Sequence, residues 1–255
     1  MRRLLAILAG FAIMATACSR DLSFVQMSDP QIGFLDPSPV CGVTDSLMRL
    51  AVLQANALKP DMVFITGDLV NDAGSAMQDS IYRLRRAGLD APVWEVQGNH
   101  DPRGHIRFAV RKRGCVFIGI DSNCIKDDDA VAEASQLEWL KDELRRARGA
   151  RHIFVFLHCP IIRESIDEPE DYFNFPAARR EAYINLLRDA GVDAVFSGHC
   201  HRCYSCTYEG ISFFTAGPVG TPLGPGTSGF NFIKVDKNGF SVDYLELRQP
   251  QAVSN

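Results

Sequence analysis

Apolar residues gather in short runs along this chain, and amphipathic stretches lie between the runs. Runs rich in Val, Ile and Phe are typical of strands, several of them buried on both faces. Strands that alternate with helices predict a largely parallel, helix-covered sheet. The expected strands are residues 22–27, 61–66, 92–97, 115–120, 152–157, 192–197 and 211–216, and the expected helices are 44–58 capped by Thr44, 76–87, 136–147 opened by a Ser135–Glu138 capping box, and 177–190.

The pattern changes near the C-terminus. Residues 231–247 alternate between apolar and polar on both sides of Asn238-Gly239, which is a strong signal for a β-hairpin. The sequence therefore predicts an antiparallel portion that joins the parallel one. The preceding stretch 217–229 is long and rich in Gly and Pro, which in a compact domain predicts a functional loop.

Polar side chains follow five of the expected strands at the point where each strand ends. Because the carboxyl ends of parallel strands meet at one edge of a sheet, we expect these side chains to converge there. Singly, each has an ordinary explanation as a turn, a cap or a surface residue. The residues are Asp29 and Gln31 after the first strand, Asp68 after the second, Asn99, His100 and Asp101 after the third, His158 after 152–157, and His199 and His201 after 192–197.

Together these residues form a mixed set of oxygen and imidazole donors, which suits divalent transition metals. The set is too large for one tetrahedral ion and fits two ions that share a bridging carboxylate. The formal net charge of −4 offers no basic stripe for a phosphate backbone, so we expect no nucleic-acid partner.

The ordered motifs resemble the calcineurin-like metallophosphoesterase family over residues 22 to about 247. They are D-x-Q from Asp29, G-D-x-x-N from Gly67, G-N-H-D from Gly98, the lone His158, and G-H-x-H from Gly198. The resemblance implies an α/β fold, a four-layer α/β/β/α sandwich with two mixed sheets flanked by helices. It places a dimetal site at the carboxyl ends of the strands.

The resemblance also implies a role for each residue. Asp29, Gln31, Asp68 and His201 would hold one divalent ion, and Asp68, Asn99, His158 and His199 the second, with Mn, Fe or Zn as candidates. His100 would assist the leaving group and Asp101 would orient it, while Asn71 would support its loop. Gln31 stands where the family more often has histidine, and an amide oxygen is a weaker donor that favours a harder ion such as Mn²⁺.

The implied reaction is hydrolysis of phosphoesters by in-line attack of a hydroxide between two metals. Phosphomonoesters are the expected substrates. Phosphoserine and phosphothreonine are included because the stretches "ESIDEPEDYFNFP" and "VFSGHCHR" resemble the family's serine/threonine protein phosphatases. Phosphodiesters, nucleotides and lipid-linked phosphates are the alternative substrates on the same fold.

Three rival interpretations start from other features. Cys200, His201, Cys203 and Cys206 would form a zinc module, although their spacing is cramped. Cys203 and Cys206 would form a redox pair, but such motifs usually open a helix and here a turn and a strand are expected to follow. A binding protein without activity is disfavoured because His100 and Asp101 are intact.

The N-terminus resembles a bacterial lipoprotein signal. Arg2 and Arg3 precede an apolar run over 4–14 and small residues that lead to Cys18. We expect export, lipidation of Cys18 and membrane anchoring of a single domain, residues 19–255, that faces the periplasm or the cell surface. Ordinary secretory cleavage is the alternative. Seven cysteines then remain, an odd number whose pairing the sequence does not predict, and it does not predict an oligomeric state.

Overall fold

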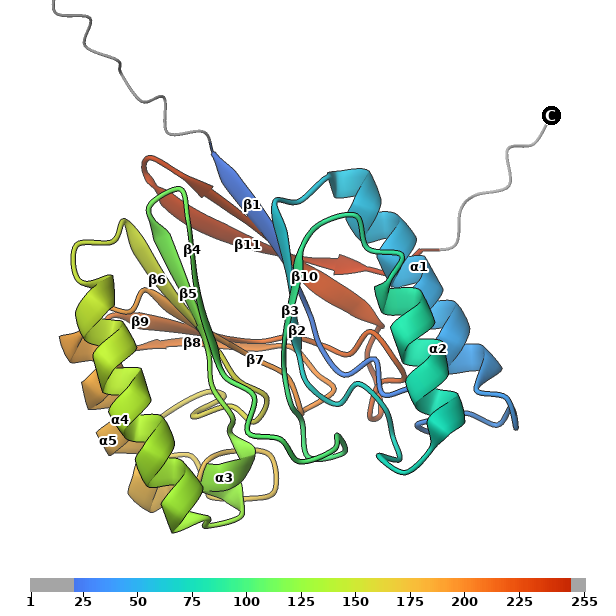
Figure 1. The fold of residues 1–255 in the computed structure, drawn as a ribbon, viewed down its shortest axis with the longest axis horizontal. Coiled ribbons are helices and arrows are strands. Elements are labelled where there is room, and N and C mark those ends of the chain that lie inside the picture. The colour runs from blue at the N-terminus through green and yellow to red at the C-terminus, as the bar shows by residue number, and fades with distance from the viewer. Residues whose placement is uncertain (1–20, 249–255) are drawn as a thin grey trace, which may run out of the picture.

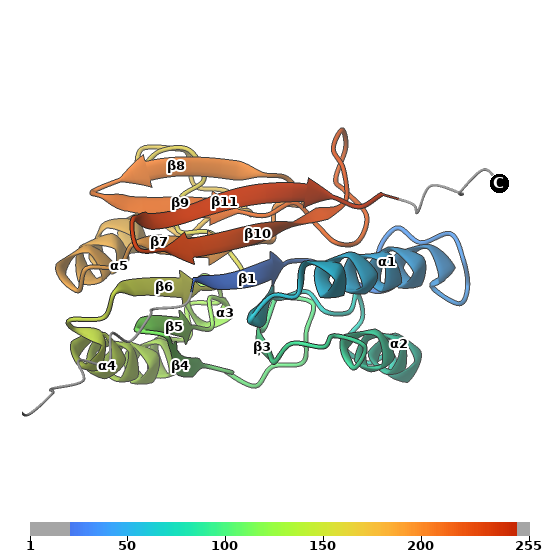
Figure 2. The same cartoon turned by 90° about the horizontal axis from the view of Figure 1, so that it is seen from above.

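Two β-sheets lie face to face with helices on their outer sides (Figures 1 and 2). The computed structural model describes residues 21–248. The strands are β1 (Leu22–Met27), β2 (Met62–Thr66), β3 (Val93–Val96), β4 (Phe108–Lys112), β5 (Cys115–Gly119), β6 (His152–Phe156), β7 (Ala194–Ser197), β8 (Tyr204–Tyr208), β9 (Ile211–Thr215), β10 (Gly229–Asp236) and β11 (Gly239–Glu246). The helices are α1 (Gly42–Leu58), α2 (Ala76–Arg86), α3 (Asn123–Lys126), α4 (Ala130–Ala147) and α5 (Ala177–Asp189).

The two sheets are mixed, and together with the helices they form four layers. One sheet has the order β11-β10-β1-β2-β3 and the other β4-β5-β6-β7-β9-β8. Helices α1 and α2 cover the first sheet, and α4 and α5 cover the second (Figure 1). This confirms the predicted sandwich, and the C-terminal hairpin forms as β10 and β11.

An aromatic core joins the sheets. The Phe24 ring lies 5.5 Å from Phe64 in the same sheet and 5.4 Å from Phe117 in the opposite sheet. Phe64 stacks on Phe156 at 4.1 Å. Each buried Phe contributes about 1.5–3 kcal/mol to stability. Because this core holds the two sheets together, the loops that follow their parallel strands meet at one end.

The parallel pairings decide which loops meet. β1 pairs with β2 and β2 with β3 in parallel, and in the second sheet β6 and β7 are also parallel. The loops after these strands carry the polar residues predicted to converge. The alternation of strands and helices predicted a single sheet, and that prediction is wrong. The family resemblance implied two sheets, and the structure confirms this.

Two helix starts differ from the prediction. Helix α1 begins after Cys41, not at a Thr44 cap, and the Thr44 hydroxyl instead donates to Asp36 at 2.9 Å. Helix α4 begins at Ala130, because the Asp129 carboxylate accepts a hydrogen bond from the backbone N–H of Ala132 at 3.0 Å. The Ser135–Glu138 capping box is therefore wrong, and both residues lie inside the helix.

Strands β4 and β8 were not predicted, since their exposure is mixed and they form sheet edges. Cys206 lies within β8, so no helix follows the Cys203-x-x-Cys206 pair, as the sequence predicted.

Within residues 21–248, no helix is both long and apolar enough to cross a membrane. The predicted signal segment lies outside the described residues.

Candidate active site

The loops after four strands, β1, β2, β6 and β7, bring two groups of metal-binding side chains together. Asp68, His158 and His199 form one group, and Asp29, Asp68 and His201 form the other. In each group one ligand atom per residue lies within 4.8 Å of the others, and all of these residues are buried. Asp68 belongs to both groups, which is the position that the sequence predicts for a bridging carboxylate.

The backbone turns sharply at the residues that supply these groups. Asp29, Asp68, His199 and His201 all have positive φ angles, at 48°, 49°, 67° and 51°. Residues with a side chain rarely adopt this left-handed region, and each such residue costs about 1–3 kcal/mol that the surrounding structure must offset. Strained backbone of this kind clusters at functional sites, because it points side chains where a regular strand end would not.

Gly98 and Gly198 let neighbouring loops of the site pack directly against one another. A Cβ at Gly98 would collide with the Asp68 carboxylate, with its Cγ only 2.8 Å away. A Cβ at Gly198 would collide with the Ser28 hydroxyl and would lie 2.6 Å from Asp29 Oδ2. These positions need glycine for space.

Each of the three buried histidines donates one ring N–H to a backbone carbonyl. Because a carbonyl can only accept, the bonded nitrogen carries the hydrogen and the other nitrogen presents a lone pair in the neutral ring. Partners of this kind orient metal-binding histidines. The bonds are His158 Nδ1 to Thr66 O at 2.8 Å, His199 Nε2 to Tyr172 O at 3.0 Å, and His201 Nδ1 to Thr221 O at 2.7 Å.

The remaining nitrogens point into the site. His158 Nε2 lies 3.0 Å from His199 Nδ1, 3.1 Å from Asn99 Oδ1 and 3.4 Å from Asp68 Oδ2. Two lone pairs at 3.0 Å repel one another unless a proton or a cation lies between them. The amide oxygen of Gln31 is also buried and has no hydrogen-bond partner. The donor set and these unpaired atoms therefore fit divalent metal ions.

Neighbouring charges and burial shift the pKa values of the side chains in the site. Burial opposes charge on His158, but the nearby Asp68 carboxylate outweighs it and raises the pKa of His158 to about 9. Burial likewise opposes charge on Asp68, but His158 and the His100 N–H lower its pKa to about 2. Burial and the charge on His158 lower the pKa of His199 to about 3. The positive charge of this cluster therefore lies on His158.

The proton on His158 predicts how metal affinity depends on pH. Because the pKa of His158 is raised to about 9, the metal-free ring is protonated at neutral pH and must lose its proton to bind metal. We expect the affinity for Mn²⁺ to rise about tenfold per pH unit between about pH 6 and pH 8. Calorimetry in two buffers of different ionisation enthalpy measures the released proton. An affinity that does not change with pH would contradict this protonation state.

His100 lies at the more open side of the site. Its backbone N–H donates to Asp68 Oδ1 at 2.9 Å, and its Nδ1 donates to the Asn71 carbonyl at 2.9 Å. The residue is half-buried, and within residues 21–248 its Nε2 makes no hydrogen bond. Through its carbonyl, Asn71 orients His100. The loop-supporting role expected for Asn71 stays a prediction.

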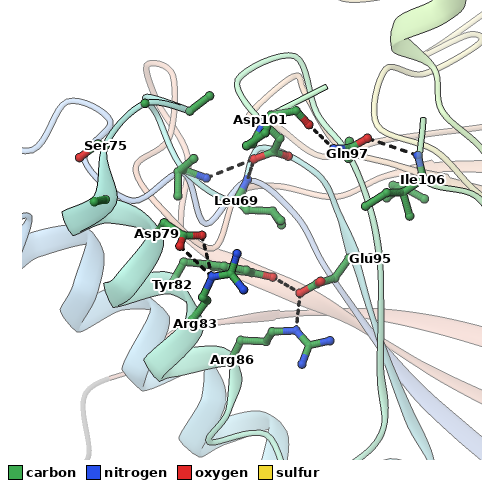
Figure 3. A pocket seen from close by; sticks show the side chains of 16 residues that line it. Leu69, Ser75, Asp79, Tyr82, Arg83, Arg86, Glu95, Gln97, Asp101 and Ile106 are labelled. Atoms are coloured by element: carbon green, nitrogen blue, oxygen red, sulfur yellow. Dashed lines mark hydrogen bonds and ion pairs between the residues drawn. The ribbon is translucent and has the colours of Figure 1, made fainter. Parts of the chain in front are cut away.

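Asp101 has a different position from the one predicted. Its carboxylate accepts the backbone N–H of Leu69 at 2.8 Å (Figure 3). It also accepts the backbone N–H of Gly98 at 2.8 Å, and so holds together the loops after β2 and β3. Within residues 21–248 no hydrogen bond joins it to the His100 ring, so the predicted orienting role is wrong. Burial raises the pKa of Asp101 to about 6.

Asp101 also lines a cavity of about 810 Å³ beside α2 and β3 (Figure 3). Of the site residues predicted from the sequence, only Asp101 lines this cavity. The charged groups there pair with each other: Arg83 with Asp79 at 2.7 Å and Arg86 with Glu95 at 2.6 Å. No residue of the two metal-binding groups lines this cavity.

The cysteines take no part in either metal-binding group of the described chain. All seven within residues 21–248 are free thiols, and Cys115, Cys124 and Cys159 are buried. The Cys200 thiol donates to the Phe173 carbonyl at 3.6 Å. A zinc module or a redox pair built on these cysteines has no support in this arrangement.

The four-layer fold and the paired donor groups define a dimetal hydrolase of phosphoric esters. The chain matches the family model of the calcineurin-like phosphoesterases over residues 22–203, and it belongs to this family. It is 30% identical to the serine/threonine-protein phosphatase CPPED1 of Danio rerio over 89% of this chain and 85% of that protein. The human protein of that name is 28% identical over 88% of this chain and 83% of its own length.

A solved structure shares the fold. The dimetal phosphatase LOC 393393 of Danio rerio superposes with a TM-score of 0.64 at 16% identity, covering 89% of this chain and 99% of that one. The resemblance seen in the sequence is thus confirmed at the level of family and fold. The chain is a metal-dependent phosphoesterase that uses two divalent ions.

Sequence reasoning missed the groups that orient the site. The carbonyls of Thr66, Tyr172 and Thr221 fix the histidines, and every residue carries a carbonyl, so no residue type marks them. Tyr172 lies in the stretch "ESIDEPEDYFNFP", whose likeness to protein phosphatases was the one available signal.

Proposed function

We propose that this protein hydrolyses phosphomonoesters, with phosphoserine and phosphothreonine as its principal substrates. The observation that carries the proposal is the pair of donor groups that share Asp68, with the free His100 Nε2 beside them. The relatives named as serine/threonine-protein phosphatases support the substrate class. When bound, two divalent cations would activate water as a nucleophile and neutralise charge on the phosphoryl oxygens.

The chain's own residues have distinct roles in this proposal. Asp29, Gln31, Asp68 and His201 hold one ion, and Asp68, Asn99, His158 and His199 hold the other. The imidazolium form of His100 protonates the leaving oxygen through Nε2, because its Nδ1 is engaged by Asn71. Asp101 keeps the loops after β2 and β3 in register, as a positioning residue.

Leaving-group dependence tests this role of His100. A seryl oxygen is a poor leaving group and needs a proton, whereas an activated aryl oxide hardly does. We expect His100→Gln to lower kcat about 10²–10⁴-fold on a phosphoserine peptide and much less on an activated aryl phosphate. Assays use full-length protein reloaded with Mn²⁺, Fe²⁺ or Zn²⁺.

His152→Gln is the matched control, because His152 lies at the start of β6, at the other end of the sheet. Equal losses on both monoesters would remove His100 as the acid. A clear preference of the wild type for aryl diesters would favour the phosphodiesterase alternative. No hydrolysis under any metal loading would contradict the proposed function itself.

We further propose that residues 1–18 direct export and that Cys18 is lipidated, which anchors the protein to a bacterial membrane. The support is the sequence alone: Arg2, Arg3, the apolar run and the small residues before Cys18. We expect mass spectrometry of the membrane fraction to find a lipid-modified N-terminal Cys18. Recovery of the unprocessed chain from the cytoplasm would contradict this. The single domain from 19 to 255 remains a prediction.

A further inference from the structure

Tyr172 connects the acidic stretch between β6 and α5 to the metal-binding groups. Its carbonyl accepts from His199 Nε2, and its ring centroid lies 4.8 Å from that of His199. Its hydroxyl reaches Asn99 on another loop. His158 and His199 are buried, with exposed fractions of 0% and 5%, whereas Tyr172 is 58% exposed. Tyr172 therefore lies on the solvent side of these side chains, where a substrate would approach.

The hydrogen bond to Asn99 determines whether the Tyr172 hydroxyl can still donate a hydrogen bond to another group. Asn99 Nδ2 donates to the Tyr172 oxygen at 2.9 Å, while Asn99 Oδ1 faces His158 Nε2 at 3.1 Å. Because the phenol oxygen accepts this bond, its own O–H remains a donor. In the part of the chain that the structure describes, that hydrogen has no protein acceptor.

We propose that Tyr172 is a substrate-binding residue whose hydroxyl donates a hydrogen bond to a phosphoryl oxygen of the phosphoester. The inference rests on the proposed function, because the group that the Tyr172 hydroxyl would bind is the phosphoester substrate of the same site. A phosphoryl oxygen is charged and acceptor-only, which matches a free O–H at the edge of a cationic centre.

The loop holds this donor in a fixed place. The Glu168 carboxylate accepts the backbone N–H of Glu164 at 2.8 Å and an amide N–H of Asn174 at 2.8 Å. Lys126 donates to the carbonyls of Asp171 at 3.0 Å and Asn174 at 2.7 Å, on both sides of Tyr172.

Arg180 holds the base of the same loop. It is 1% exposed and donates to the Phe175 carbonyl at 3.0 Å. A donor fixed before the substrate arrives loses little entropy when it binds. The bracing contacts therefore suit Tyr172 to recognition.

Tyr172→Phe tests the proposal, because it removes only the hydroxyl and keeps the ring against His199. A hydrogen bond to a charged acceptor accounts for about a 10- to 100-fold effect. In full-length, Mn²⁺-loaded protein, we expect about this loss both in affinity for inorganic phosphate, measured by calorimetry, and in kcat/KM on a phosphoserine peptide. Mn²⁺ stoichiometry and affinity should not change. Tyr208→Phe is the matched control, at the end of β8 that pairs with Ile211, away from the site.

The outcomes separate the possible explanations. Phosphate affinity and kcat/KM equal to wild type in Tyr172→Phe would overturn the proposal. A parallel loss of Mn²⁺ affinity would also overturn it, because the hydroxyl would then act only by positioning Asn99. If the wild type itself neither binds phosphate nor hydrolyses the peptide, the proposed function fails, and this inference fails with it.

Discussion

Asp68→Asn should lower kcat/KM by at least about 10³-fold, equivalent to about 4 kcal/mol of lost transition-state stabilisation. Asp68 is the only residue common to the two metal-binding groups, so the substitution removes a negative charge from both at once. It also exchanges an oxygen for an amide nitrogen that cannot serve as a ligand. The positive charge on His158 loses its partner at 3.4 Å as well.

Metal content and kinetics measured on the same preparation check this expectation. Asp90→Asn makes the same chemical change at an exposed position and should leave both quantities unchanged. If Asp68→Asn keeps full metal content and near-normal kcat/KM, Asp68 does not bridge the two groups.

Gly198→Ala should abolish activity although it adds only a single methyl group and removes no metal-binding side chain. The new Cβ would collide with the Ser28 hydroxyl and lie 2.6 Å from Asp29 Oδ2. The ends of β1 and β7 would have to separate, which breaks the bonds from the His199 N–H to the Asp29 carboxylate at 2.9 and 3.1 Å. Overpacking of this kind costs about 1–3 kcal/mol in stability.

Thermal unfolding and metal analysis together test this steric argument. Gly226→Ala is the control, because its Cβ would meet nothing closer than 3.6 Å. Adding Ser28→Ala to Gly198→Ala removes the nearest colliding atom and should restore part of the lost stability. Normal metal content and activity in Gly198→Ala alone would show that the β1 and β7 loops need no close approach.

Much of the site could be predicted because its residues follow apolar runs in a fixed order. Asp29, Asp68 and His158 each come directly after a strand, and parallel pairing then brings them together. The sequence pattern did not predict strands whose formation depends on pairing at a sheet edge. Strand β4 is only partly buried and β8 is exposed on alternate residues, so neither forms an apolar run.

Roles that depend on the path of a loop were the least predictable. Asp101 is next to His100 in sequence, yet its carboxylate turns to Leu69 and Gly98. Tyr172 reaches Asn99 across 73 positions of the chain, a contact that no local pattern encodes. The order of the motifs predicted the metal-binding side chains. The contacts that orient those side chains depend on the three-dimensional paths of the loops.

We expect two metal ions to share Asp68 as a ligand. Metal analysis of the full-length protein beside Asp68→Asn and Cys203→Ser tests it most directly. The predicted result is two divalent ions per chain in the wild type and in Cys203→Ser, with a marked loss in Asp68→Asn. One zinc per chain that is lost in Cys203→Ser and kept in Asp68→Asn would contradict the claim and favour a cysteine-based zinc module.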